Sequence, residues 1–325
     1  MKTSLLPRLV NGQTGDPALF VDIMREKRAL LFDCGDLSGL SPAEILRISD
    51  VFISHAHIDH FIGFDHLLRL HIGRGKRVKL YGPRGITSCV QGKLSGYTWN
   101  LVKRQRLVFE VREFDGKRIL ATEFLCRNRF RQRGTRLLPE SDILWRDDLV
   151  VVRSAVLDHK IPSLAFSVSE RDFYNVDPVK LKALGKTPGP WINELKRLVR
   201  SGKVNKKVLN IDGENHDASF LAQELLVVTK GKTLVYAADA QGSEKNVKTI
   251  VSFAKGTDVF FCEGAFLHAD QIRAFQTYHL TARQAGEIAR AAGVKRLIVF
   301  HFSPKYEGRF GHLEEEARRA FRGEN

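Results

Sequence analysis

A cluster of metal-ligand side chains directly follows a short apolar segment near the start of the chain. Residues 51–60 read Val-Phe-Ile-Ser-His-Ala-His-Ile-Asp-His, and the first four predict a buried strand. Side chains of an extended backbone alternate between two faces, so His55, His57 and Asp59 leave the same side of the chain. A turn at Asp59 would bring His60 to that side as well. Imidazole and carboxylate groups without a thiolate suit zinc, manganese or iron in an open hydrolytic site, so this segment predicts a metal centre.

Further ligand-type residues stand at the ends of other predicted elements. Helices and buried strands alternate along the chain, which indicates an α/β architecture. Three strands predicted in the last third each end at such a residue, namely Asp239, Glu263 and His301. His159 lies in a predicted turn between two strands. Sites in α/β folds assemble at the carboxyl ends of strands, so we expect these side chains to gather with the first cluster.

The first cluster resembles the H-x-H-x-D-H signature of the metallo-β-lactamase fold, a hydrolase superfamily whose members usually carry two metals. The resemblance implies an α/β fold in the form of an αββα sandwich, with the site at its edge. A length of 325 residues suits one large domain with insertions. We therefore expect a single domain over residues 1–325.

The chain after residue 150 resembles ribonuclease Z, the endonuclease that trims the 3′ trailer from precursor tRNA. The matching segments keep the family's order and rough spacing; they are residues 159–166 with Glu170, then 187–196, 238–240, 262–266, 279–285 and 301–306. The resemblance implies a metal-dependent phosphodiesterase that cleaves RNA with a hydroxide activated by two metals. It also implies precursor tRNA or another RNA as the partner, and it allows a homodimer.

The resemblance also assigns a role to each ligand-type residue. It implies two divalent metal ions, with zinc as the first choice and manganese or iron as alternatives. The implied ligands are two sets of three and one bridging residue: His55, His57 and His159; Asp59, His60 and His301; and Asp239. His279 would give a proton to the leaving oxygen, and Glu263 would orient its imidazole. Asp59 is counted with this pair in the catalytic set.

Some residues beside these positions depart from the family pattern. The family's Gly-Asp-Thr reads Ala-Asp-Ala at residues 238–240, and its His-Glu-Ala-Thr reads Cys-Glu-Gly-Ala at residues 262–265. Every ligand position is kept, but the changed residues border the cleft, so two alternatives stay open. One is a hydrolase of the same fold that acts on a small phosphodiester or ester. The other is a non-catalytic, nucleic-acid-binding relative.

Charge and composition favour a polyanionic partner in the cytoplasm. The chain holds 52 Lys and Arg against 37 Asp and Glu, a net charge of +15, and such an excess favours nucleic acid. Four cysteines without a C-x-x-C pair predict reduced thiols, as in the cytoplasm. Residues 1–7 lack the apolar run of a signal peptide, and the longest apolar runs are strand-length, so we expect no membrane association.

Two basic segments compete for the task of holding RNA. Residues 171–215 are rich in Pro, Gly and Lys and predict an inserted, substrate-binding arm that projects without a core of its own, with an amphipathic helix after residue 189. Residues 124–133, interpreted as one strand, would place four arginines on one face: Arg127, Arg129, Arg131 and Arg133. That stripe also suits an edge strand whose charges prevent aggregation. We therefore favour the arm.

Overall fold

The computed structural model describes residues 5–24, 26–139 and 141–324. Residues 1–4, part of the segment examined for a signal peptide, lie outside the described residues. The chain divides into two compact units. The main unit takes the residues up to Glu170 and from Lys232 onward, and the inserted unit is Arg171–Gly231. In the described part of the chain, no helix has the length and apolar character needed to cross a membrane.

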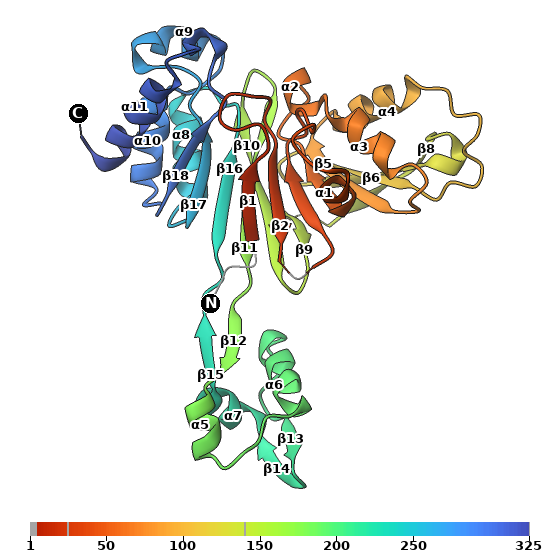
Figure 1. Cartoon of the computed structure of the whole chain (residues 1–325), viewed down its shortest axis with the longest axis vertical. Coiled ribbons are helices and arrows are strands. Elements are labelled where there is room, and N and C mark those ends of the chain that lie inside the picture. Colours follow the sequence, from red (N-terminus) through yellow and green to blue (C-terminus); the bar gives the residue numbers. More distant parts are fainter. Residues whose placement is uncertain (1–4, 25, 140, 325) are drawn as a thin grey trace. The chain divides into compact units, whose positions relative to one another are not determined.

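Two β-sheets face each other in the main unit, as the predicted sandwich requires (Figure 1). The larger sheet has strand order β1-β2-β3-β4-β5-β6-β7-β8, and its strands are β1 (Leu5–Leu9), β2 (Leu19–Ile23), β3 (Ala29–Phe32), β4 (Ile48–Phe52), β5 (Arg77–Pro83), β6 (Val108–Phe114), β7 (Ile119–Leu125) and β8 (Gln132–Leu138). The smaller sheet has order β18-β17-β16-β11-β10-β9, and its strands are β9 (Ile143–Arg146), β10 (Val150–Asp158), β11 (Pro162–Glu170), β16 (Thr233–Ala237), β17 (Val259–Glu263) and β18 (Leu297–Phe300).

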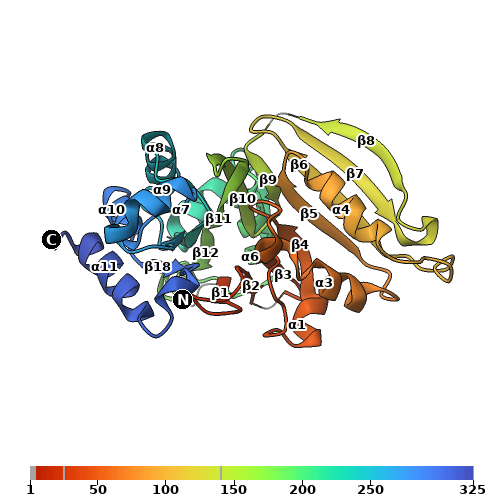
Figure 2. The same ribbon diagram turned by 90° about the horizontal axis from the view of Figure 1, so that it is seen from above.

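Helices cover the outer face of each sheet (Figure 2). Those beside the larger sheet are α1 (Pro42–Arg47), α2 (Ile58–Phe61), α3 (Phe64–His71) and α4 (Ile86–Ser95). Those beside the smaller sheet are α8 (Glu244–Phe253), α9 (Gln271–Gln276), α10 (Ala282–Ala291) and α11 (Phe310–Arg322). Short 3-10 turns complete the unit: η1 (Cys126–Asn128), η2 (His268–Asp270) and η3 (Pro304–Tyr306).

Three apolar clusters hold the layers together. One lies between the sheets, where Phe52 stacks between Phe32 and Tyr81 with ring centroids 4.9 and 4.6 Å away. The other two lie between each sheet and its helices. Strands β3 to β6 run parallel to one another, and so do β16 to β18. Since parallel strands end at the same edge of a sheet, their carboxyl ends can share one site.

Local sequence signals set several helix ends as predicted. The Ser41 hydroxyl and the Glu44 side chain form the capping box of α1, with Pro42 in its first turn. Thr281 and Gln284 form the same reciprocal pair at the start of α10. Each box satisfies backbone N–H groups that would otherwise lack partners, which fixes where the helix begins.

The predicted strand over residues 124–133 is wrong. The strand β7 ends at Leu125, the turn η1 follows, and β8 begins at Gln132. Arg129 and Phe130 both take left-handed backbone conformations, with φ of 58° and 53°. The reason is that Phe130 is buried in the core between the larger sheet and its helices, which breaks the simple alternation of faces.

The inserted unit has a core of its own, contrary to the expectation for an arm without one. Its elements are β12 (Phe173–Val176), α5 (Pro178–Ala183), α6 (Pro190–Arg200), β13 (Val208–Ile211), β14 (Glu214–Asp217), α7 (Ala218–Leu225) and β15 (Leu226–Thr229). The predicted amphipathic helix is α6, which buries Trp191, Leu195 and Leu198 against residues of the α7 region. Strand β12 pairs with β15, so the unit runs beyond residue 215.

Candidate metal centre

The first cluster of ligand-type residues lies where β4 ends and α2 begins. His55 is wholly buried in the loop between them. His57 is the N-cap residue of α2, and Asp59 and His60 lie inside that short helix. The turn predicted at Asp59 is therefore a single helical turn that begins one residue earlier, at Ile58. This turn brings His60 toward the same place as the residues before it.

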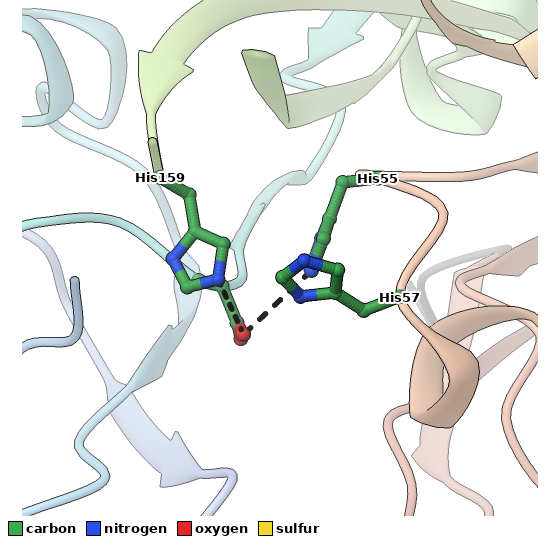
Figure 3. Close-up of side chains that lie close together, drawn as sticks. His55, His57 and His159 are labelled. Carbon is green, nitrogen blue, oxygen red and sulfur yellow. Dashed lines mark ion pairs between the residues drawn. The ribbon is translucent and has the colours of Figure 1, made fainter. Parts of the chain in front are cut away.

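One ligand group combines His55, His57, His159 and Asp239. One ligand atom from each of them lies within 4.8 Å of all the others. His55 Nε2 and His159 Nε2 lie 3.8 and 3.5 Å from Asp239 Oδ2. Figure 3 shows the three imidazoles turned toward one another, with His55 and His57 on one chain segment and His159 at the end of a strand from another part of the chain.

A second ligand group combines Asp59, His60 and His301. His60 Nε2 and His301 Nδ1 lie 3.4 and 3.0 Å from Asp239 Oδ1. His301 Nε2 lies 3.2 Å from Asp59 Oδ2. Asp239 therefore turns one carboxylate oxygen toward each group, which is the arrangement a bridging ligand needs.

Four atoms of these groups are buried without a hydrogen bond. Across the described residues, His55 Nε2, His60 Nε2, Asp239 Oδ1 and His301 Nδ1 have no hydrogen-bond partner. Leaving a buried polar atom unpaired costs roughly 1–3 kcal/mol, so several together call for an explanation. Cations among imidazole nitrogens and carboxylate oxygens would satisfy all four atoms. The residues present thus fit a divalent metal centre.

Beside the two groups, His279 pairs with Glu263. His279 Nδ1 lies 2.9 Å from Glu263 Oε2, and Glu263 is fully buried at the end of β17. The other carboxylate oxygen accepts a hydrogen bond from Ala240 N at 2.6 Å. His279 Nδ1 is also 3.8 Å from Asp239 Oδ2. The pair can hold the imidazole in one orientation at the rim of the metal centre.

Comparison with known proteins decides the family. A model described as the metallo-beta-lactamase superfamily matches residues 17–93. Ribonuclease Z of Deinococcus radiodurans is 30% identical over 309 residues, which cover 93% of this chain and 91% of that protein. Ribonuclease Z of Anoxybacillus flavithermus is 31% identical over 317 residues, or 94% of this chain and 86% of that one. The chain belongs to the ribonuclease Z family.

Solved structures agree on the fold of this ribonuclease Z relative. The metallo-beta-lactamase fold protein YhfI from Bacillus subtilis aligns with a TM-score of 0.57 at 16% identity, covering 97% of this chain and 93% of that one. The short form of human tRNase Z aligns with a TM-score of 0.53 at 17% identity, covering 93% of each chain. The fold is thus the metallo-β-lactamase sandwich predicted above. Membership of the ribonuclease Z family makes the chain a metal-dependent hydrolase, and its His and Asp groups fit divalent metal.

Asp33, a buried acid that the sequence analysis did not single out, contacts His60 on the side away from the metal centre. Asp33 Oδ2 lies 2.8 Å from His60 Nδ1, so it accepts the proton there and leaves Nε2 free to face the centre. The same carboxylate accepts bonds from Ser54 N, Ser54 Oγ and Tyr236 Oη, at 2.6, 2.9 and 2.8 Å. Asp33 directly follows strand β3, so the strand-end rule applied to Asp239 could have identified it.

Opposing charges offset burial inside the ribonuclease Z centre. Burial raises the pKa of Asp239, but His301 and His60 lower it by more, so this pKa lies well below its ordinary value. Burial lowers the pKa of His60, yet Asp239 and Asp33 outweigh that effect and raise it to about 10. Burial, followed by repulsion from His60, lowers the pKa of His55 to about 2. The Asp239 carboxylate is thus ionised, and binding of a cation by His60 Nε2 requires that the imidazole be neutral.

The structure brings every residue of the predicted site to one place. The gathered residues are His55, His57, Asp59, His60, His159, Asp239, Glu263, His279 and His301. His159 and His279 reach the centre from two separate loops. Tyr278, the residue before His279, joins these loops, because its carbonyl oxygen lies 2.7 Å from His159 Nδ1. Asp33, Ser54 and Tyr236 are the additions that sequence reasoning missed.

Proposed function

We propose that this protein is an endoribonuclease that removes the 3′ trailer of precursor tRNA by hydrolysing one phosphodiester bond. Relatives named ribonuclease Z that cover most of the chain support the substrate. The observation that carries the proposal is the His279–Glu263 pair beside the two ligand groups. An acid placed next to a metal centre suits a reaction whose leaving oxygen needs a proton.

The proposed metal ligands are the residues of the two groups. His55, His57 and His159 would hold one ion, Asp59, His60 and His301 the other, and Asp239 would bridge them. Zinc is the proposed metal, because the donors are imidazoles and carboxylates. Two such ions, when bound, supply positive charge to a phosphate and make water a nucleophile at neutral pH.

The chain's own residues then complete the reaction. Glu263 Oε2 accepts the Nδ1 proton of His279, which leaves Nε2 as the atom that delivers a proton. The proton goes to the 3′ oxygen of the tRNA as the bond to the trailer phosphate breaks. Asp33 keeps the His60 ring in the tautomer whose Nε2 lone pair faces the centre. The products are a tRNA with a 3′-hydroxyl and a trailer with a 5′-phosphate.

We further propose that the inserted unit is the arm that holds the tRNA body. It carries eleven Lys and Arg against seven Asp and Glu. Six of its cations lie at or after the second half of α6: Lys196, Arg197, Arg200, Lys203, Lys206 and Lys207. Folded RNA is recognised largely by shape and phosphate contacts, so a small basic unit with its own core suits this role. The proposal includes a homodimer, which analytical ultracentrifugation would test.

Incubation of metal-loaded protein with end-labelled precursor tRNA tests the proposed substrate. We expect one cut, at the junction of the tRNA body and the trailer. A chromogenic small phosphodiester run in parallel reports on the metal centre alone. Turnover of the small diester with an intact precursor would favour the small-substrate hydrolase instead. Metal binding without turnover of either compound would favour the non-catalytic relative.

A further inference from the structure

Three loops of the main unit meet to form one basic surface. Val108 N donates to Lys76 O at 3.0 Å, and Cys126 N donates to Leu107 O at 3.0 Å, so the segments before β5, before β6 and after β7 lie side by side. Their exposed cations form what we call the arginine surface: Arg74, Lys103, Arg104, Arg106, Arg127, Arg129 and Arg131. The chain has no Asp or Glu from residue 66 to 109 or from 124 to 139.

Packing and backbone hydrogen bonds hold the turn after β7 in place. Phe130 is buried, and its ring centroid lies 4.8 Å from that of Trp99. Arg129 N donates to Cys126 O at 2.8 Å, and Phe130 N donates to Leu125 O at 3.0 Å. Two consecutive residues with left-handed backbones are unusual outside glycine, and such conformations persist where the surroundings enforce them. Anchoring Phe130 inward leaves the arginines on either side of it directed outward.

The seven cations of the arginine surface are all exposed to solvent. Within the described ranges, none of the seven makes an ion pair. On the neighbouring sheet face, by contrast, arginines do form ion pairs: Glu110 lies 2.9, 2.7 and 3.7 Å from Arg77, Arg112 and Arg136. Arg133 is left out of the arginine surface because it stands opposite an acidic residue of β7 in the sheet. Like charges held close together without partners repel, so the arrangement calls for an anionic ligand.

We infer that the arginine surface binds the phosphate backbone of double-helical RNA. Six of its seven cations are arginines, whose planar guanidinium groups match phosphate in pairs of hydrogen bonds. The choice of RNA among polyanions rests on the proposed function. The surface lies on loops of the main unit that supply none of the proposed metal ligands, so it would hold RNA away from the cleaved bond. It is distinct from the inserted unit and would add contacts that do not depend on RNA sequence.

Binding of a labelled, blunt-ended RNA duplex to the full-length protein tests this inference. The variant Arg127→Ser/Arg131→Ser removes two cations whose backbones are not left-handed, so the turn should keep its shape. If each arginine contacts one phosphate, the slope of log K against log salt should fall by roughly 1.4–1.8. This change in slope corresponds to an affinity of the variant for the RNA duplex that is about 20-fold lower near 0.15 M salt. Since the duplex has no trailer, the result does not depend on cleavage.

Lys245→Ser/Lys255→Ser is the matched control. Both lysines are exposed on and after α8 and make no ion pair in the part of the chain that the structure describes, so the change in net charge is identical. We expect this control to bind duplex RNA with a slope close to that of the unaltered protein. Arg127→Lys/Arg131→Lys keeps the charge, so its RNA binding should keep most of the salt dependence. This variant separates the loss of charge from damage to the fold.

Two results would overturn the inference. One is an equal loss of RNA binding in Arg127→Ser/Arg131→Ser and in the control Lys245→Ser/Lys255→Ser, which would show that only net charge matters. The other is unchanged duplex binding in the arginine variant with lost binding to vesicles of anionic lipid. Leu101 is 86% exposed beside Lys103, so a lipid surface is the partner that such a result would indicate. Failure to cut precursor tRNA would refute the proposed function without changing this measurement.

Discussion

Asp33→Asn should weaken metal binding although Asp33 is not a ligand. The carboxylate accepts four hydrogen bonds, and Oδ2 takes three of them, from Ser54 Oγ, His60 Nδ1 and Tyr236 Oη. Asparagine keeps the shape but replaces one acceptor oxygen with a donor. The His60 tautomer that accepts from this new donor carries its proton on Nε2, the atom that faces the metal centre. The metal must then compete with that proton.

The expected size follows from these contacts. Loss of a ligand's supporting partner typically lowers metal affinity 10- to 100-fold, or about 1.4–2.7 kcal/mol. The metal-free protein should also lose on the order of 2–3 kcal/mol of stability, because a hydrogen bond to a charged group contributes about 1.5–3 kcal/mol. Tyr236→Phe is the control, since it removes one bond to Asp33 at 2.8 Å and leaves the imidazole untouched.

Competition between metal-depleted protein and a chromogenic chelator for zinc measures the effect. Thermal unfolding of the metal-depleted variants, followed in parallel, shows that each is folded at the temperature of the titration. Tyr236→Phe should bind zinc nearly as well as the unaltered protein. A folded Asp33→Asn variant with unaltered zinc affinity would refute the claim that Asp33 sets the His60 tautomer.

Three further predictions follow from the same site. Asp239→Ala should remove most of the bound metal, because this carboxylate faces both groups; elemental analysis with full metal content would contradict it. His279→Ala should keep its metal while kcat for precursor tRNA falls about 100-fold or more, and an unchanged kcat would show that another group donates the proton. Replacing residues 171–231 with a short Gly linker is feasible because Glu170 N donates to Lys232 O at 2.8 Å. This deletion should raise KM for tRNA strongly and leave small-diester hydrolysis nearly unchanged. An unaltered KM would show that the inserted unit does not hold the tRNA.

The meeting of most of these side chains in one place could be predicted, because they carry local signals in the sequence. His55, His57 and His60 share one short segment after a strand, and Asp239 and His301 each follow a buried strand. Parallel strands deliver such residues to a common edge, so the strand-end pattern indicated that they would gather, while their roles as ligands were implied by the family resemblance. The capping boxes of α1 and α10 were predictable for a similar reason, since the pairs are only three residues apart.

What the sequence did not reveal depends on contacts between distant residues. Asp33 and Tyr236 are 203 positions apart, and only the packing of the two sheets joins them. The arginine segment was misinterpreted as a strand because its alternation was regular, while the burial of Phe130 beside Trp99 decides the turn. The end of the inserted unit was placed too early because β12 pairs with β15, a partner some fifty residues later.

The chemical nature of the new RNA end tests the central claim most directly. Precursor tRNA cut by metal-loaded protein can be analysed for the group on the 3′ end of the tRNA and on the 5′ end of the trailer. Hydrolysis at the metal centre, with His279 protonating the leaving oxygen, predicts a 3′-hydroxyl on the tRNA and a 5′-phosphate on the trailer. A 2′,3′-cyclic phosphate or 3′-phosphate on the tRNA would mean that the ribose hydroxyl attacks instead, and would contradict the account.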